Sequence, residues 1–204
     1  MEGQGLVKIY AAVEGPVDEA VVRRLAREVS ANAATVYGKK GKHDLKRRIT
    51  GYNEAARFAP WLVLVDLDQD ADCAPHVKRV WLSMPSPKMC FRVAVRAVEA
   101  WLMADQGRLA RFLGVQANRV PRQPDLEENP KQTMIRLCTM SRRRDIRQDM
   151  LARPGSGREV GPAYTSRLIE FTQSLWCPAE AADSSDSLLR CLKRLRDLVG
   201  QAQV

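Results

Sequence analysis

The fold that this sequence predicts depends on one stretch, Trp61-Leu62-Val63-Leu64-Val65-Asp66-Leu67-Asp68-Gln69-Asp70. It is an apolar run that begins after Pro60 and ends in three acids at alternate positions. A run of this length, bounded by proline and by charge, predicts a buried strand. Strands of a parallel sheet are buried on both faces and show no polar alternation, so the run favours a parallel sheet.

The three acids at the end of this run are expected to crowd together, because side chains two positions apart in an extended segment point the same way. Carboxylates packed that closely repel one another unless a cation or protons neutralise them. Mg²⁺ is a hard ion that prefers oxygen ligands. The sequence therefore predicts a Mg²⁺ (or Mn²⁺) site, with Asp66 and Asp68 as its first ligands and Asp70 as a second-rank one.

Two other interpretations of this acidic segment fail on its residues. An EF-hand loop needs glycine at its sixth position and glutamate at its twelfth, and Ala71 and Val77 stand there. A haloacid-dehalogenase-type motif wants Thr or Val four residues after the first aspartate, where the chain has Asp70. A plain acidic turn stays open as an alternative.

Length and composition indicate a soluble globular chain. Its 204 residues are 45% apolar and 28% charged, enough for one large domain or for a domain with a helical extension. No run of eighteen apolar residues predicts a membrane span, and the N-terminus does not resemble a secretory signal. Five scattered cysteines without a Cys-x-x-Cys pair argue against a disulfide framework and structural zinc, and favour a reducing cytoplasm.

The charge balance is strongly basic, with a net charge of +9. A basic surface favours anionic partners, and nucleic acid, DNA or RNA, is the first of these. The alternative is a surface that is merely soluble.

The order of expected elements predicts a doubly wound α/β domain with a mostly parallel sheet. Strands are expected at 6–13, 35–37, 61–66 and 89–95, and helices at 16–30, 43–58, 75–84 and 96–105. Beyond residue 105 no strand is convincing. Helices are expected there at 106–113, 130–140, 144–152, 164–176 and 185–199. The chain is thus predicted to hold an α/β domain at 5–105 and a helical extension at 106–204 packed on it.

A second acidic position, Glu14, follows the first expected strand, and Asp18 lies four residues later. Ligands of open α/β sheets gather at the carboxyl ends of the strands, so Glu14 and the Asp66 cluster are expected at one edge of the sheet. The alternative is that both acids simply favour the start of the following helix.

A third group of candidates combines Arg92, Arg96 and Glu99. An arginine in an otherwise buried strand must find an anionic partner, so Arg92 is expected to face the Asp66 cluster or a substrate phosphate. Arg96 could clamp phosphate, because guanidinium is planar and always charged. The alternative is a structural ion pair with Glu99 or Asp66.

Three further segments are candidates for binding phosphate or nucleic acid. The loop 38–42 carries Lys39, Lys40 and Lys42 and is either a phosphate clamp or a solvated turn. The glycine-rich stretch 153–166 is no Walker A loop, yet it could present N–H groups to an anion, and Thr165 or Ser166 would cap the following helix. Its candidates are Arg158, Tyr164, Thr165 and Ser166, and its alternative is a capped structural loop.

The last basic segment is the run at 142–144. Arg142 and Arg143 could belong to a nucleic-acid track, or they could lie on a solvated helix face. No aromatic residues are interleaved with them, so base stacking is not predicted there.

Taken in order, these motifs resemble the Toprim domain, the metal-binding fold of topoisomerases, primases, recombination factors and overcoming-lysogenization-defect nucleases. More closely, the chain resembles a bacterial Toprim-like family, domain of unknown function 4276. The resemblance rests on Val13-Glu14-Gly15-Pro16-Val17-Asp18-Glu19, on 66–70, on Arg92 to Asp105 and on Gly161-Pro162-Ala163-Tyr164-Thr165-Ser166. The Toprim-like part covers about residues 6–105.

The Toprim resemblance implies metal-dependent phosphodiester chemistry on nucleic acid, such as a nuclease of phage defence. Glu14 would be the general acid or base, and Asp66 and Asp68 would hold Mg²⁺, converging within about 5 Å because Mg–O distances are short. The auxiliary acids would be Asp18, Asp70 and Glu99. Topoisomerases pair this fold with a catalytic tyrosine on another domain, but Tyr164 has no special claim to that role, and a chain this short is expected to lack the gate domains.

Two other classes of function stay open. One is a non-catalytic nucleic-acid-binding or regulatory module that keeps the fold, as the Toprim domains of recombination factors do. The other is a nucleotide-handling protein that uses the loop 155–166. A partner protein encoded with the chain is a separate expectation.

Overall fold

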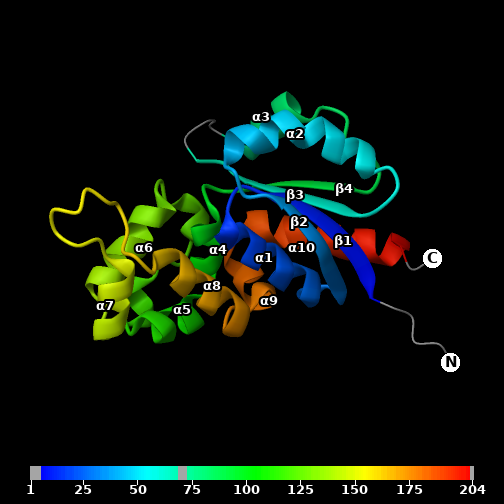
Figure 1. Cartoon of the computed structure of the whole chain (residues 1–204). Helices are drawn as coiled ribbons and strands as arrows, with labels where there is room; N and C mark the ends of the chain where they lie inside the picture. Colours follow the sequence, from blue (N-terminus) through cyan, green and yellow to red (C-terminus); the bar gives the residue numbers. More distant parts are fainter. Residues whose placement is uncertain (1–5, 69–72, 203–204) are drawn as a thin grey trace.

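The computed structural model describes residues 6–68 and 73–202 and shows an α/β protein built on one four-stranded parallel sheet (Figure 1). This confirms the predicted fold class. The sheet order is β2-β1-β3-β4. The strands are β1 (Val7–Val13), β2 (Ala31–Gly38), β3 (Trp61–Asp66) and β4 (Met89–Ala94).

The strand order places a topological switch point between β1 and β3. The chain leaves β1 for β2 on one side, and β3 and β4 are added on the other side. Tyr10 pairs with Trp61 and Ala12 with Val63, so the carboxyl ends of β1 and β3 lie next to each other. Ligands of open α/β sheets bind in the crevice at such a switch point.

Helices cover both faces of the sheet, which explains the uniformly apolar β3. Leu62 and Leu64 pack into one core with α1 (Pro16–Glu28), and Val63 and Val65 pack into another. The second core lies under α2 (Lys42–Ala55) and α3 (Ala74–Trp81). Figure 1 shows α2 and α3 above the sheet and α1 below it.

The helical half of the chain completes the core beneath the sheet. Trp101 is fully buried, its indole N–H donates to Ser187 Oγ at 2.6 Å, and its carbonyl accepts from the Trp176 indole at 3.1 Å. The α-helices here are α4 (Val98–Ala104), α5 (Gln106–Leu113), α6 (Pro130–Thr139), α7 (Arg144–Met150), α8 (Tyr164–Ser174), α9 (Pro178–Ala181) and α10 (Asp186–Ala202). Short 3-10 turns lie at Ala117–Arg119, Pro124–Leu126 and Ala182–Ser184.

Three local predictions were wrong. Strand β2 is eight residues long rather than three, because Ala31 and Ala33 pack against the sheet core although alanine has little strand preference of its own. Helix α4 begins at Val98, since Ala97 is extended. Helix α8 begins at Tyr164 after Ala163, so neither Thr165 nor Ser166 caps it.

Gly38 ends β2 in a conformation that other residues adopt at a cost, with φ +87°. A Cβ there would lie 2.2 Å from the carbonyl oxygen of Val13. We expect Gly38→Ala to lower the free energy of unfolding by about 3 kcal/mol, from backbone strain plus the clash. Chemical denaturation measures this change.

Gly41 provides the matched control, because its φ is +83° and a Cβ there meets nothing within 4 Å. Gly41→Ala should cost only the backbone strain, about 1–2 kcal/mol, because φ +83° with ψ 171° is a conformation that few residues other than glycine adopt. Equal losses in the two variants would contradict the role given to the contact between Gly38 and Val13.

Candidate functional site

Two acids meet where β1 and β3 end. Glu14 directly follows β1, and Asp66 is the last residue of β3. The Asp66 backbone N–H donates to Glu14 Oε1 at 2.9 Å, which fixes the glutamate against the neighbouring strand. The sequence predicted both residues at one sheet edge, and the strand order makes them neighbours at the switch point.

Two more acids approach from the helices that follow these strands. Asp18 lies in the first turn of α1 and accepts from the Gly15 N–H at 2.7 Å. Glu99 lies in the first turn of α4 and accepts from the Tyr164 hydroxyl at 3.2 Å. The Val98 N–H at the same helix start donates to Asp66 Oδ1 at 3.0 Å. Helix N-termini thus hold carboxylates toward the switch point.

Burial and mutual repulsion raise the pKa values of these carboxyl groups. Asp18 is only 6% exposed, and its burial, with the charges of Glu14 and Glu99, raises its pKa to about 7. The pKa of Asp66 is raised well above its usual value. Burial is the largest cause, and repulsion from the nearby carboxylates of Asp18, Glu99, Glu14 and Asp68 adds to it. Burial also raises the pKa of Glu99, against the hydrogen bond from Tyr164. The cluster therefore holds protons near neutral pH or requires a cation.

Asp68 is turned toward cations. Its backbone is left-handed, with φ +50°, and its N–H donates to the Arg96 carbonyl at 2.7 Å. Its carboxylate lies 2.8 Å from Lys42 Nζ, and Arg96 donates to its carbonyl at 3.0 Å. The expected convergence of Glu14, Asp66 and Asp68 on one ion is not seen among the described residues, and the Asp68 carboxylate pairs with Lys42 instead.

Within residues 6–68 and 73–202, no three Asp, Glu, His or Cys side chains are arranged to ligate one ion as they stand. Glu14, Asp18 and Asp66 each use an oxygen on a backbone N–H instead. Asp70, also predicted as a ligand, lies outside the described residues.

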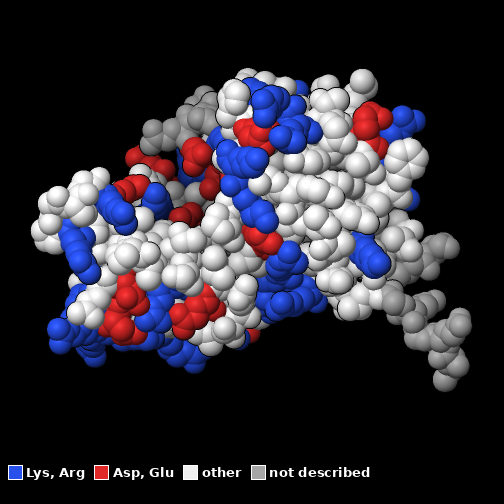
Figure 2. Space-filling view, in the orientation of Figure 1, with Lys and Arg blue, Asp and Glu red and all other residues white. Residues whose placement is uncertain are grey.

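Glu14, Asp66, Asp68 and Glu99 line a cleft of about 740 Å³ between the sheet edge and the helical half, and Asp18 does not line it. Figure 2 shows acidic side chains gathered in this hollow, with basic ones around it. Arg96, Tyr164 and Thr165, all predicted site residues, also line it. The sequence reasoning missed the far wall, which consists of Glu128, Asn129, Pro130, Lys131, Glu159 and Val160.

The sequence contains one local sign of this far wall, the residues that begin helix α6. Asn129 precedes Pro130, and its side chain accepts from the Gln132 N–H at 3.1 Å as the cap of α6. That start places Lys131 beside Glu159 at 2.5 Å. Nothing in the sequence indicated that this helix start faces the acids.

The three lysines of the predicted basic loop 38–42 have different surroundings. Lys39 pairs with Glu19 at 3.0 Å on α1, and Lys42 pairs with Asp68 at the cleft. Lys40 is exposed. A clamp on phosphate by this loop stays a prediction.

Arg92 is separate from the acids. It lines a hollow bordered by α3 and α10 rather than the cleft, and no ion pair in the described ranges joins it to an acidic side chain. The expectation that it faces the Asp66 cluster is wrong, because the register of β3 and β4 places Arg92 opposite Leu64, two residues before the Ala94 that pairs with Asp66.

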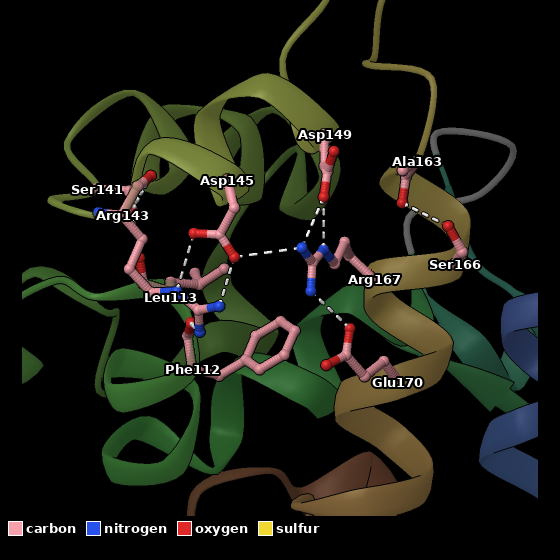
Figure 3. Close-up of polar contacts among 10 residues, drawn as sticks. All are labelled: Phe112, Leu113, Ser141, Arg143, Asp145, Asp149, Ala163, Ser166, Arg167 and Glu170. Carbon is pink, nitrogen blue, oxygen red and sulfur yellow. Dashed lines mark hydrogen bonds and ion pairs between the residues drawn. The ribbon is translucent and has the colours of Figure 1, made fainter.

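Arg143 and Ser166 make internal contacts (Figure 3). Arg143 pairs with Asp145 at 2.5 Å, donates to the Phe112 carbonyl at 2.8 Å and lies over the Phe112 ring. The Ser166 hydroxyl donates to the Ala163 carbonyl at 2.9 Å. These contacts fix α7 and α8. Arg142 and Arg158 are exposed, and their role in nucleic-acid binding stays a prediction.

No family model, curated protein or solved structure matches this chain. Within the described residues, no helix is both long and apolar enough to cross a membrane.

The raised pKa of Asp18 makes stability depend on pH. The folded protein holds this proton more tightly than an unfolded chain, whose aspartates titrate near pH 4. The bound proton on Asp18 therefore contributes its full share to the free energy of unfolding below about pH 4, and this contribution is lost as pH rises to about 7. In metal-free buffer at pH 8, we expect Asp18→Asn to raise the free energy of unfolding by about 2 kcal/mol.

Asp145→Asn is the matched control for this measurement. Its hydrogen bond from Arg143 lowers the pKa of Asp145, so its charge stabilises the fold and its removal should bring no gain at pH 8. Urea denaturation at pH 5 and pH 8 compares the variants. The explanation would be contradicted if the wild-type protein were as stable at pH 8 as at pH 5 and Asp18→Asn did not raise the free energy of unfolding at pH 8.

Proposed function

We propose that this protein carries out Mg²⁺-dependent phosphodiester chemistry on nucleic acid, as a Toprim-like nuclease. The observation that carries the proposal is the contact of Glu14 with Asp66 at the switch point, inside an open cleft. Switch points are where α/β sheets bind ligands. A role in phage defence rests on the resemblance alone.

The chemistry of the side chains in the cleft fits a hard divalent cation. The donors are carboxylate oxygens from Glu14, Asp66, Asp68 and Glu99, and neither histidine nor cysteine lines the cleft among the described residues. Mg²⁺ and Mn²⁺ prefer such oxygen ligands. Burial first, and then the charges of neighbouring carboxylates, raises the pKa values of Asp18, Asp66 and Glu99, and a bound cation would favour their charged forms.

The proposed roles follow from position. Asp66 and Asp68 would hold the ion, with Asp68 exchanging its contact with Lys42 for it, and the bound ion would stabilise charge developing on phosphate oxygens. Glu14 would take a proton from the attacking water or return one to the leaving oxygen, because its side chain is anchored at the Asp66 N–H beside the cleft. Tyr164 would orient Glu99 through its hydrogen bond.

Cations around the cleft support an anionic substrate. Arg96 lines it beside Asp68, and Lys131 lines the opposite wall. Lys42 lies at the Asp68 carboxylate. Guanidinium and ammonium groups bind phosphate oxygens by charge-assisted hydrogen bonds. Together with the net charge of +9, these side chains favour a phosphate backbone over a neutral substrate.

One observation favours a second function, a non-catalytic nucleic-acid-binding module of the same fold. The Glu14 carboxylate accepts from a backbone N–H, and the Asp68 carboxylate pairs with Lys42. In the described ranges, no three acidic side chains are arranged to ligate one ion. A module that only binds nucleic acid would keep the basic side chains and need no ion.

We expect purified protein to cleave DNA or RNA with Mg²⁺ or Mn²⁺ and not with EDTA. Glu14→Gln and Asp66→Asn should each slow cleavage by about 100-fold or more, since general acid–base and ion-holding groups contribute at least that much. Asp44→Asn is the control, because Asp44 pairs with Arg47 and Arg48 on the α2 surface. Cleavage assays on labelled substrates measure the rates.

The outcomes separate the two functions. If no substrate is cut and both cleft variants still bind nucleic acid like the wild-type protein, the nuclease proposal fails and the binding module is favoured. Equal activity in the wild-type protein and Asp66→Asn would also reject the proposed ion site.

Ion binding should also be visible as stability. At pH 8, millimolar Mg²⁺ is expected to raise the unfolding midpoint by about 4 °C or more, because it neutralises the carboxylates of the folded state only. Asp66→Asn should lose this rise, and NaCl of equal ionic strength should not reproduce it. A similar rise in the Asp66→Asn variant would place the ion elsewhere.

A further inference from the structure

A second charged site lies along β4, the outer strand of the sheet. Arg92 sits in the middle of β4, and its Nε is fully buried without a hydrogen-bond partner. Buried polar groups are nearly always hydrogen-bonded, and an unsatisfied one costs about 1–3 kcal/mol, more when charged. Among the described residues, the Arg92 Nε therefore has no hydrogen-bond acceptor.

Further cations surround Arg92. It lines a cavity of about 370 Å³ together with Lys78 of α3 and Arg190 of α10. Figure 1 shows α3 on one side of β4 and α10 on the other. A second hollow of about 270 Å³ shares Lys78 and Arg92 and adds Arg194. The two hollows therefore lie along one cationic strip, which consists of Lys78, Arg92, Arg190 and Arg194.

The acids of the described ranges do not neutralise this strip. No ion pair within 6–68 and 73–202 joins Arg92 or Lys78 to a carboxylate. Asp186 also lines the larger cavity, but it pairs with Arg190 at 2.7 Å. Burial and the nearby Arg92 charge lower the pKa of Lys78, which shows that the two cations repel each other.

We propose that this cavity, held by Arg92 and Lys78 at the outer edge of β4, binds a small phosphate monoester. A dianion would accept from the half-buried Arg92 guanidinium and would neutralise both cations. The volume falls in the range of small-molecule sites and exceeds that of phosphate alone. Leu67, Pro75, Val93 and Val95 also line it, so an organic group attached to the phosphate finds an apolar wall.

This site is distinct from the acidic cleft. Leu67 lines the cationic cavity, while the next residue, Asp68, lines the cleft. Glu14 and Asp66 line only the cleft, and Arg92 and Lys78 do not line it. The proposal therefore does not depend on nuclease activity, and the Asp66→Asn variant separates the two sites.

Isothermal titration calorimetry of the full chain tests the proposal with inorganic phosphate, adenosine monophosphate and adenosine. We expect both phosphates to bind and adenosine not to bind. Arg92→Met and Lys78→Met should each weaken binding about tenfold or more, as loss of a charged hydrogen bond does. The control is Arg79→Met, a neighbouring exposed charge on α3 outside the cavity, which should stay within about twofold of wild type.

Two further measurements guard against a folding artefact. Without ligand, Arg92→Met should unfold at the same or a higher temperature than wild type, because it removes an unsatisfied buried group. Phosphate should raise the unfolding midpoint of the wild-type protein and of Asp66→Asn alike. Tighter binding of the nucleotide than of inorganic phosphate would identify an organic ligand, and equal binding would identify phosphate alone.

Three results would overturn the proposal. The first is that the wild-type protein does not bind phosphate. The second is that Arg79→Met weakens phosphate binding as much as Arg92→Met does. The third is that Asp66→Asn abolishes phosphate binding while Arg92→Met still binds phosphate. The last result would move the phosphate to the acidic cleft.

Discussion

The hydrogen bond from the Asp66 N–H to Glu14 is the contact on which the acidic site depends. It joins the residue after β1 to the end of β3, at the one place where the sheet order reverses. Because the helices that follow these strands begin here, their first turns add Asp18 and Glu99. Four carboxyl groups thus share a small volume, and their repulsion is relieved by protons, by backbone N–H groups or by a cation.

The helical half makes this arrangement rigid and shapes its cleft. Trp101 and Trp176 join α4 to the C-terminal helices through a buried core that continues beneath the sheet. The same helices supply Tyr164 behind Glu99 and Lys131 on the far wall. The segment after residue 105 is therefore part of the candidate site rather than an appendage, and its packing decides how wide the cleft is.

Acidic and basic side chains predominate in two different hollows beside β3 and β4. Acids gather at the switch point, while Arg92 and Lys78 gather along the outer edge of β4. Net charge alone would have suggested one diffuse basic surface, whereas the fold gathers acids in one hollow and several cations in another.

The sequence by itself determined the α/β class, most elements and the placement of Glu14 and Asp66 at one sheet edge. These follow from local physics, because apolar periodicity and acids after strands depend on near neighbours. Only the tertiary structure decided the strand order, the length of the alanine-rich β2 and the far wall of the cleft. It also separated Arg92 from the acids and turned Asp68 toward Lys42. Those features depend on contacts between residues far apart in the chain, which no local pattern records.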